Sequence, residues 1–531
     1  MSLHRFHGGL RLPARKIAAT RPIQPCPLPA ELVMSLAQHA GAAARPVVRV
    51  GQTVRRGECI AQATDGLSAS VHAGSSGRIL AIEDRPVPHA SGLAAQCIVI
   101  QTDGRDDWLR LPALPIETPR HALLDRLADC GVVGLGGAAF PTATKLVPVC
   151  ETLVINAAEC EPHIACDDGL LRERADAVVA GVQWLQRICA ASRVLIAIED
   201  AMTDATLALT RAVQRCADPR LQVSEVPTIY PQGGERQLIR VLTGHEVPAG
   251  GLPQDIGILC HNVATAYAVS RAIEYGEALT SRIVSVSGAG IGSPGNFDVH
   301  LGTSLEFLIA HAGGYGPDAA RLVMGGPMMG IALPHDGVPV VKACNSVLVL
   351  GAGEIRRSAP EMPCIRCGEC VRVCPAQLMP QQLFDAIRLD DWQQTERLAL
   401  SVCIECGCCA QVCPSQIPLV DWYRHGKSEI AIAQRRDTQA NTARIRYEAR
   451  NIRLAREQAE RVARISDRAV VPVAPRAEAT TLDTPSLTVA ATSPPMDKSA
   501  VLAAIARGRA RKQARDAETK PPAQPPDDSS A

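Results

Sequence analysis

Residues 364–375 read CIRCGECVRVCP, and residues 403–414 read CIECGCCAQVCP. Both runs have the spacing C-x2-C-x2-C-x3-C-P, which is typical of proteins that hold two [4Fe–4S] clusters. In this pattern three thiolates of one run bind one cluster, and the fourth cysteine, before the proline, binds the other cluster. The predicted ligand sets are Cys364, Cys367, Cys370 and Cys413 for one cluster, and Cys403, Cys406, Cys409 and Cys374 for the other.

Zinc is the main alternative, but zinc sites usually join two C-x2-C pairs and lack the third cysteine and the C-P ending. Cys408 is out of step with the spacing and is predicted to be a bystander. Gly368 and Gly407 allow the ligand loops to turn tightly. We therefore assign residues 351–425 to a ferredoxin-type, largely helical domain with two clusters, which transfers single electrons.

The composition is that of a soluble multidomain protein. The chain has 531 residues, 47% of them hydrophobic, and a net charge of +1, so nothing in the charge balance points to nucleic acid. No apolar stretch is long enough for a transmembrane helix, and the first residues lack the apolar core of a signal peptide. We expect a cytoplasmic location, where the 20 cysteines stay reduced.

The overall pattern predicts a multidomain α/β and α+β protein. Short alternating strands in 1–120 indicate a barrel-sandwich module similar to biotinyl and lipoyl carriers. Its predicted hairpin tip, ATDGLSAS, has no lysine for an attached cofactor, so we interpret the module as structural. Alternating helices and strands in 121–280 indicate an α/β domain, and strand–turn–strand–helix in 281–350 indicates a β-grasp unit.

The C-terminal part differs in composition. Residues 426–465 are predicted to form a basic helical segment, because 424–464 carry eleven Lys or Arg against five Asp or Glu. Residues 466–531 are rich in Pro, Ala, Ser and Thr and are predicted to be disordered, apart from a short amphipathic helix near 497–518.

A glycine-rich loop, GVVGLGGAAFPTATK, occupies 131–145, and three more polar segments follow it. Glycines let the backbone approach a phosphate or a flavin ring closely. One of these segments, with Asn156 and Glu159, follows a predicted strand, where ligands of open α/β sheets bind. The candidate binding residues are Gly134, Gly136, Gly137, Phe140, Lys145, Asn156, Glu159, Gly233, Gly234, Glu235, Asn262 and Thr265. The loop alone is also consistent with a tight turn of packing glycines.

Together these segments resemble the FMN-binding domain of the NADH-oxidising subunit of respiratory complex I. The resemblance implies that the loop glycines and Lys145 hold FMN, that Phe140 faces NADH, and that Asn262 and Thr265 bind the FMN phosphate. It also implies that Asn156 and Glu159 lie along the flavin and the nucleotide. The sequence departs from the family pattern at Leu135, at Ala139 and in the QGGE turn at 232–235.

The order of the modules, with NAAECEP at 156–162 and GGPMMG at 325–330, resembles the RnfC family, also called RsxC. Members of this family are components of the Rnf-type ion-translocating electron transport complex. The resemblance implies a peripheral protein on the cytoplasmic face of the bacterial inner membrane. It would pass electrons from NADH through FMN and two [4Fe–4S] clusters to the membrane subunits of the complex. The basic segment could assist by attraction to anionic lipid.

Two other functions remain open. Cobalamin reductases of bacterial microcompartments share the flavin, β-grasp and dicluster modules and act as soluble enzymes. A flavin-free electron relay would use only the clusters. Glu159 and Glu161 also have an alternative role as helix caps, and the neighbouring His163 and His261 are predicted to be structural.

Overall fold

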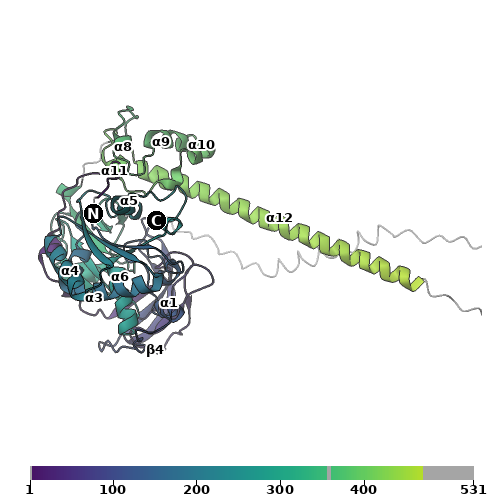
Figure 1. Ribbon diagram of the computed structural model, residues 1–531, viewed down its shortest axis with the longest axis horizontal. Helices are drawn as coiled ribbons and strands as arrows, with labels where there is room; N and C mark the ends of the chain where they lie inside the picture. Colours follow the sequence, from purple (N-terminus) through teal and green to yellow (C-terminus); the bar gives the residue numbers. More distant parts are fainter. Residues whose placement is uncertain (1–2, 356–359, 470–531) are drawn as a thin grey trace, which may run out of the picture. The chain divides into compact units, whose positions relative to one another are not determined.

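A computed structural model describes residues 3–355 and 360–469, with side chains to residue 466. Residues up to Thr442 form one compact unit, and a second unit begins at Ala443. The expected multidomain α/β and α+β organisation is confirmed (Figure 1). The predicted amphipathic helix near 497–518, and all of the predicted disordered tail beyond Ala469, lie outside the described residues.

A parallel four-stranded sheet forms the middle of the central domain, in the order β11-β10-β9-β12. Its strands are β9 (Thr152–Ala157), β10 (Arg193–Glu199), β11 (Leu221–Val226) and β12 (Ile258–Asn262). Strands β9 and β10 are rich in Val, Ile and Leu because both faces of a parallel sheet are buried. The chain adds β10 and β11 on one side of β9 and β12 on the other. Ligands of open α/β sheets bind beyond the carboxyl ends of the strands at such a switch point.

Helices cover both faces of this sheet. The helices of this domain are α1 (Arg120–Asp129), α2 (Thr142–Lys145), α3 (Cys166–Cys189), α4 (Thr203–Cys216), α5 (Glu235–Thr243) and α6 (Val263–Glu274), with a 3-10 turn η2 (Pro253–Ile256) before β12. Apolar side chains of α5 pack on one face, whereas those of α3, α4 and α6 pack on the other. The C-terminal ends of β9 and β12 and the start of α6 are left free to form a site.

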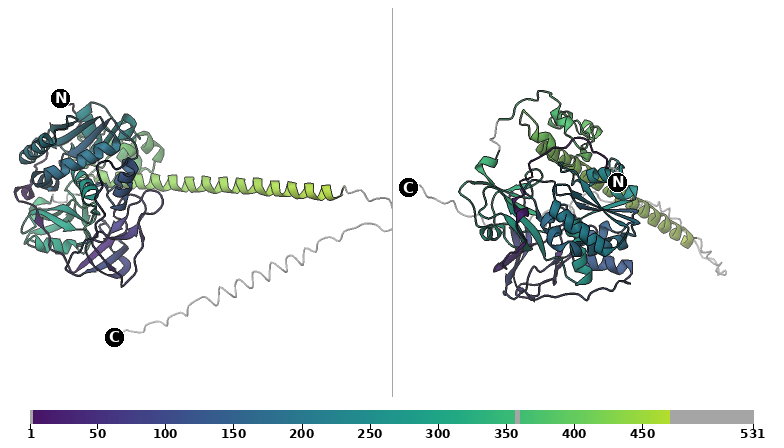
Figure 2. Two further views of the ribbon diagram at one scale, coloured as in Figure 1. Left: turned by 60° about the horizontal axis from the view of Figure 1, so that its bottom comes forward. Right: turned by 60° about the vertical axis from the view of Figure 1, so that its left-hand side comes forward.

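The barrel-sandwich module consists of two small antiparallel sheets, β2-β8-β7-β4 and β3-β5-β6. Its strands are β2 (Glu31–Ser35), β3 (Arg45–Pro46), β4 (Thr53–Val54), β5 (Cys59–Gln62), β6 (Val71–His72), β7 (Gly77–Pro86) and β8 (Ala94–Thr102). The module lies beside the β-grasp sheet, and the amide of Val33 donates to the carbonyl of Gly302 at 2.9 Å (Figure 2).

The β-grasp unit is a six-stranded sheet in the order β1-β14-β13-β17-β15-β16, with helix α7. Its elements are β13 (Ser281–Ser287), β14 (Gly295–His300), α7 (Leu305–His311), β15 (Ala319–Met324), β16 (Ile331–Leu333), β17 (Ser346–Gly351) and the turn η3 (Ala352–Glu354). Strand β1 (Gln24–Pro25) pairs with β14 in parallel. This strand and the turn η1 (Ile17–Thr20) come from the range that the sequence pattern assigned to the barrel-sandwich module.

The cysteine domain is built from short helices around two thiol-lined cavities. They are α8 (Glu369–Arg372), α9 (Pro380–Arg388), α10 (Trp392–Arg397), the turn η4 (Leu400–Val402) and α11 (Cys408–Gln411), followed by α12 (Leu419–Ala469). The hydroxyl of Tyr423 on α12 is buried and donates to the carbonyl of Pro380 at 2.8 Å. The start of α12 is therefore part of this domain's core.

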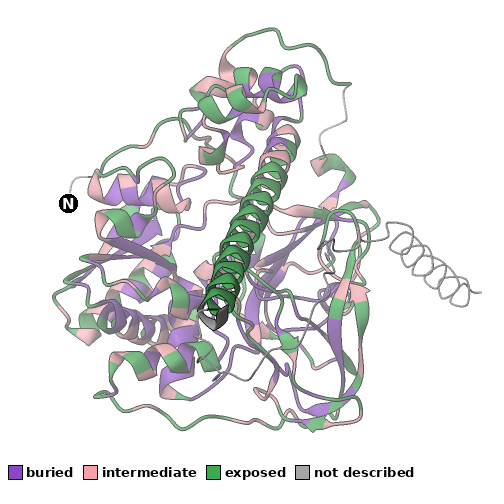
Figure 3. Ribbon diagram, turned by 90° about the vertical axis from the view of Figure 1, so that its right-hand side faces the viewer, coloured by how far each residue is buried: buried purple, intermediate pink, exposed green. Residues whose placement is uncertain are grey.

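Helix α12 continues over the predicted basic segment and is exposed on every side from 432 to 466 (Figure 3). Within the second unit, Arg453 and Arg456 form i,i+4 ion pairs with Glu457 and Glu460 at 3.8 and 3.6 Å. Such exposed pairs each contribute only about 0.3–0.5 kcal/mol to helix stability.

Candidate functional site

A cavity of about 200 Å³ lies at the carboxyl ends of β9 and β12, where the sheet topology predicts a ligand site. Its lining includes nine of the twelve candidate binding residues. The nine are Gly134, Gly136, Phe140, Lys145, Asn156, Gly233, Glu235, Asn262 and Thr265, and Ala138, Thr142, Cys260 and His261 complete the wall. Segments that are separated by more than 100 residues thus converge on one space.

Hydrogen bonds hold the glycine loop against the start of α6. The amide of Leu135 donates to Oγ1 of Thr265 at 2.9 Å, and the amide of Gly134 donates to the carbonyl of Phe140 at 2.8 Å. A Cβ atom on Gly136 would lie 3.2 Å from Cβ of Asn262. The glycine at 136 therefore lets the loop approach the helix that forms the base of the cavity.

The two asparagines position backbone groups around the cavity. Asn156 Nδ2 donates to the carbonyl of Gly233 at 2.9 Å, which joins the end of β9 to the QGGE turn. Asn262 Oδ1 accepts from the amide of Ala264 at 2.8 Å and caps α6. The N-terminus of α6 carries a partial positive charge, which is suited to a phosphate group.

The polar groups in the wall fit a bound phosphate and flavin. Lys145 Nζ lies 2.7 Å from Glu235 Oε1, so this ion pair joins the end of the glycine loop to the start of α5. Oγ1 of Thr142 and Nε2 of His261 are buried and have no hydrogen-bond partner among the described residues. Burial, with a smaller contribution from Lys145, lowers the pKa of His261 well below its usual value, so its ring is neutral. A ligand with hydroxyl or carbonyl groups would satisfy these two unpaired atoms.

Glu159, Gly137 and Gly234 are not among the residues that line this cavity. The carboxylate of Glu159 accepts from the amides of Asp167 and Asp168 at 3.0 and 3.4 Å, at the start of α3. It also lies 3.6 Å from Nζ of Lys16. This is the helix-capping arrangement that the sequence left open as an alternative. Gly234 is the residue before α5, and Gly137 has a φ of +120°, which favours glycine.

Glu161 joins two loops next to the site. Its carboxylate accepts from the amides of Met328 and Met329 at 3.1 and 2.8 Å, so it connects the NAAECEP segment to GGPMMG. Burial is the main cause that raises the pKa of Glu161 to about 7. A carbonyl of this second loop, that of Met328, lies close to Gly407 between two predicted cluster ligands.

Eight cysteines gather around two cavities in the cysteine domain. One cavity is lined by Cys364, Cys367, Cys370 and Cys413, and the other by Cys374, Cys403, Cys406 and Cys409. These are the groups of four that the spacing indicates, each taking its fourth thiol from the other run. Four thiols around one space fit a [4Fe–4S] cluster, whose ligands are cysteine thiolates.

The two loops repeat the same backbone conformation. Gly368 and Gly407 have φ of +78° and +77°, and Arg366 and Glu405 both have φ of +56°. Cys408 is fully buried and lines the second cavity beside its four candidate ligands. Its role as a bystander remains a prediction.

A buried contact chain joins the glycine-loop cavity to the second cysteine cavity. The amide of Gly233 donates to Sγ of Cys160 at 3.2 Å, and the hydroxyl of Tyr230 donates to the carbonyl of Cys406 at 2.6 Å. Cys160, Tyr230 and Cys406 belong to one apolar cluster, together with Cys408 and Met328. Sequence reasoning assigned no role to Tyr230 or Thr142, although Thr142 lies within the glycine-rich loop at 131–145 and Tyr230 lies two residues before the QGGE turn.

The N-terminal segment fastens this junction. The amide of Gly9 donates to the carbonyl of Val373 at 3.0 Å, and Leu10 and Tyr230 exchange two backbone hydrogen bonds of 2.7 and 2.8 Å. The segment thus contacts both the central domain and the cysteine domain.

Four family models match the chain. They are described as the RnfC barrel sandwich hybrid domain (4–105), the Nuo51 FMN-binding domain (127–271), the SLBB domain (283–332) and a 4Fe-4S dicluster domain (363–417). The FMN-binding match covers every residue that lines the glycine-loop cavity, and the dicluster match covers all eight cysteines.

Curated relatives that are named as the C subunit of an ion-translocating oxidoreductase complex match most of the chain. The protein of Pseudomonas aeruginosa is 47% identical over 87% of this chain and 60% of its own length. The protein of Yersinia pestis is 43% identical over 88% of this chain and 76% of its own length. The protein of Rhodobacter capsulatus is 43% identical over 78% of this chain and 81% of its own length. The chain thus spans less than two thirds of the Pseudomonas protein.

A solved NAD+-reducing [NiFe]-hydrogenase structure is similar at 19% identity and a TM-score of 0.42, over 57% of this chain and 63% of the other. Within 3–355 and 360–469, no helix is both long and apolar enough to span a bilayer.

Proposed function

Because the chain belongs to the RnfC family, whose members are C subunits of ion-translocating oxidoreductase complexes, we propose that it is the electron-input component of such a complex. It takes electrons from NADH at the glycine-loop cavity and passes them through two [4Fe–4S] clusters to membrane subunits. The family also supplies the proposed location, the cytoplasmic face of the inner membrane.

The observation that carries this proposal is the continuous contact between the two kinds of site. Gly233 belongs to the wall of the glycine-loop cavity and bonds to Cys160, and Cys160 packs in the same cluster as Tyr230 and Cys406. A donor site and a cluster site that share one buried boundary support direct electron transfer between them. A soluble enzyme with unrelated uses for its two sites would not need this junction.

FMN supplies the conversion that such a protein needs, because a flavin takes up two electrons as a hydride and releases them singly. The residues of the chain provide binding and orientation. Lys145 and the N-terminus of α6 offer positive charge to the phosphate, whereas Thr142 and His261 offer unpaired polar atoms to the flavin. Phe140 provides the face toward the nicotinamide. Glu159 acts indirectly, since it holds the start of α3.

The contacts also support an order for the two clusters. The cluster of Cys374, Cys403, Cys406 and Cys409 would be the first acceptor, because the Cys406 loop packs on Tyr230 and Met328. The cluster of Cys364, Cys367, Cys370 and Cys413 would be the exit, because Cys364 and Cys367 are exposed. A partner protein could therefore approach the exit cluster closely.

The test is an anaerobic titration of the purified chain with NADH, followed by visible absorbance and electron paramagnetic resonance. We expect bleaching of the flavin near 450 nm, a general property of flavins, together with reduction of both clusters. Iron–sulfur absorbance that does not respond to NADH, in a chain without flavin, would refute the proposal and favour a relay.

Two matched variants test the order of the clusters. Cys403→Ser removes a ligand of the proposed first acceptor cluster. After rapid mixing with NADH, the exit cluster of this variant should therefore stay oxidised. Cys367→Ser removes a ligand of the proposed exit cluster and should leave reduction of the first cluster unchanged. The opposite pattern would reverse the order.

A further inference from the structure

A second, larger cavity of about 420 Å³ lies on the other side of the glycine loop. Three domains enclose it: the barrel-sandwich module, helices α3 and α6 of the central domain, and strands β13 and β14 of the β-grasp unit. This volume falls within the range of roughly 300–1,000 Å³ that is usual for small-molecule sites. None of the twelve candidate cofactor residues lines it.

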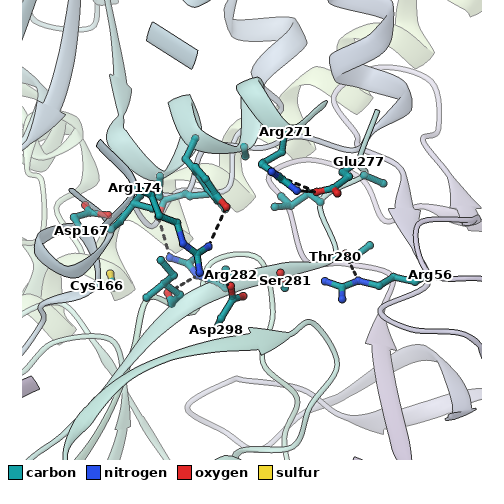
Figure 4. Close-up of a pocket in the computed structure, with 18 of the residues that line it drawn as sticks. Arg56, Cys166, Asp167, Arg174, Arg271, Glu277, Thr280, Ser281, Arg282 and Asp298 are labelled. Atoms are coloured by element: carbon teal, nitrogen blue, oxygen red, sulfur yellow. Dashed lines mark hydrogen bonds and ion pairs between the residues drawn. The ribbon is translucent and has the colours of Figure 1, made fainter. Parts of the chain in front are cut away.

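Positive charge dominates the wall of this cavity, which is lined by five arginines and three carboxylates. Figure 4 labels all of them except Arg110. The arginines are Arg56, Arg110, Arg174, Arg271 and Arg282, and the carboxylates are Asp167, Glu277 and Asp298. Burial is the main cause that raises the pKa of Asp167 to about 7, so this carboxylate is only partly ionised at neutral pH. Arg56 is paired with Asp106, which does not line the cavity, at 2.6 Å, so the excess of positive charge comes from Arg282 and from the two arginines that share Glu277.

Arg282 is the least compensated of these groups. Its residue is only 5% exposed, and its guanidinium donates to three backbone carbonyls, including that of Leu135 at 3.2 Å. Among the described residues, no carboxylate forms an ion pair with it. Arg282 favours the charged form of the nearby Asp167, but burial of that carboxyl outweighs this effect, so an anionic ligand would add the negative charge that the buried guanidinium lacks.

The neighbouring arginines keep donors available to a ligand. Arg174 donates to Asp298 at 3.1 Å and to the hydroxyl of Tyr267 at 2.9 Å, at a point where α3 departs from helical backbone angles. Arg110 and Arg271 share one carboxylate, that of Glu277, at 2.9 and 2.6 Å. Each guanidinium has five N–H donors, so these pairs leave donors unused.

We propose that this cavity is a binding site for a phosphate-bearing small molecule, separate from the flavin and nicotinamide site. Guanidinium groups that approach from several sides match the three oxygens of a phosphate, and they bind it in bidentate fashion. Apolar side chains such as Leu170 and Ala268 in the same wall offer a surface for the carbon part of a nucleotide. Both a nucleotide and an inorganic polyphosphate have the required chemistry.

The site shares a wall with the glycine-loop cavity. Arg282 donates to the carbonyl of Leu135, whose amide donates to Thr265 in the other cavity. Asn262 Nδ2 in that cavity donates to Oδ2 of Asp167 at 2.6 Å. An anion that engages Arg282 or displaces Asp167 would therefore act on groups that position the flavin loop.

The test uses the full chain with its iron and flavin, in the presence of saturating FMN and NAD+ so that the glycine-loop cavity is filled. The probes are inorganic pyrophosphate, GDP and guanosine, and guanine is chosen because NAD+ carries adenine. Binding is measured by calorimetry. In parallel, phenylglyoxal modification of each arginine is mapped by peptide mass spectrometry.

Arg215 provides the matched control, since it pairs with Asp176 as Arg174 pairs with Asp298, but lies on α4 outside the cavity. We expect pyrophosphate or GDP to protect Arg174 and Arg271 from modification and to leave Arg215 reactive. Arg174→Gln should weaken binding by roughly 10-fold or more, because it removes a charged donor, whereas Arg215→Gln should not. If GDP binds more tightly than pyrophosphate, the natural ligand is a nucleotide. If GDP and pyrophosphate bind equally tightly, the natural ligand is an inorganic polyphosphate.

Three results would overturn the proposal. One is the absence of protection and binding with both phosphate probes at millimolar concentration. Another is binding of guanosine as tight as that of GDP, which would show that charge does not matter. The third is competition between the probes and FMN or NAD+, which would assign the binding to the glycine-loop cavity. The protection experiment uses the wild-type chain, so it decides the question even where a variant does not fold.

Discussion

Two adjacent glycines in the QGGE turn should respond very differently to the same substitution. A Cβ atom on Gly233 would lie 2.3 Å from the backbone carbonyl oxygen of Ala158, at the end of β9. A Cβ atom on Gly234 would lie 2.4 Å from Oε1 of Gln237, which is the far end of a flexible side chain. That oxygen has no hydrogen-bond partner among the described residues, so the amide can rotate without breaking a hydrogen bond.

The magnitude follows from the distance by which the backbone must move. Ordinary contact begins at 3.4 Å, so Gly233→Ala requires the turn and the end of β9 to separate by about 1.1 Å. Overpacking of this kind costs about 1–3 kcal/mol. Because Gly233 lines the cavity and its carbonyl binds Asn156, we expect FMN affinity to fall by roughly 5- to 150-fold. Gly234→Ala should change the FMN affinity by less than about 2-fold.

The assay is fluorescence titration of the flavin-stripped chain with FMN. Iron content and circular dichroism are measured in parallel, to show that the rest of each variant is intact. Wild-type affinity in Gly233→Ala would refute the proposed contact between this turn and the flavin. Equal losses in both variants would show that the turn responds to any added methyl group, and that the backbone oxygen is not the cause.

Three further predictions concern the junction, a buried lysine and the cavity's ion pair. Tyr230→Phe removes the donor to the carbonyl of Cys406 and should cost about 1–2 kcal/mol locally, which would appear as faster loss of iron to a chelator from the proposed first cluster only. Lys342 is fully buried, and burial lowers its pKa from 10.5 to about 7. Between these values the unfolded chain holds a proton that the folded chain lacks, so stability should rise with pH from about 7 to 10.5, by at most about 5 kcal/mol. The thermal midpoint of Lys342→Met should not rise between pH 7 and pH 10.5 as that of the wild type does. An equal rise in both proteins would contradict a role for Lys342. Lys145 and Glu235 are about one third exposed, so Lys145→Met should leave the thermal midpoint nearly unchanged and weaken FMN or NADH binding. A large drop in the midpoint would indicate a structural role instead.

Motifs that rely on local spacing were read directly from the chain. The C-x2-C-x2-C-x3-C-P runs predict two clusters because the spacing alone brings three thiols into one loop. Strands such as β9 and β10 were also predictable, since a run of buried Val, Ile and Leu needs no partner to be recognised. Nine of the twelve candidate binding residues line the glycine-loop cavity, and the resemblance to FMN-binding domains implies a role for seven of the nine.

The direction of single side chains was not predictable in the same way. Glu159 lies in a motif next to the site, yet its carboxylate binds the amides at the start of α3. An unpaired helix N-terminus nearby offers a buried carboxylate more favourable hydrogen bonds than an open cavity does. Only the packed positions of β9 and α3 reveal which of these two environments the side chain occupies.

The sequence by itself determined the cofactor chemistry of this protein, because thiol spacing and glycine loops act over a few residues. The tertiary structure alone decided the contacts between modules. Tyr230 meets Cys406 across 176 residues, and the arginine-lined cavity draws side chains from three domains. Such meetings depend on how whole domains pack together, and no periodicity or local spacing along the chain encodes them.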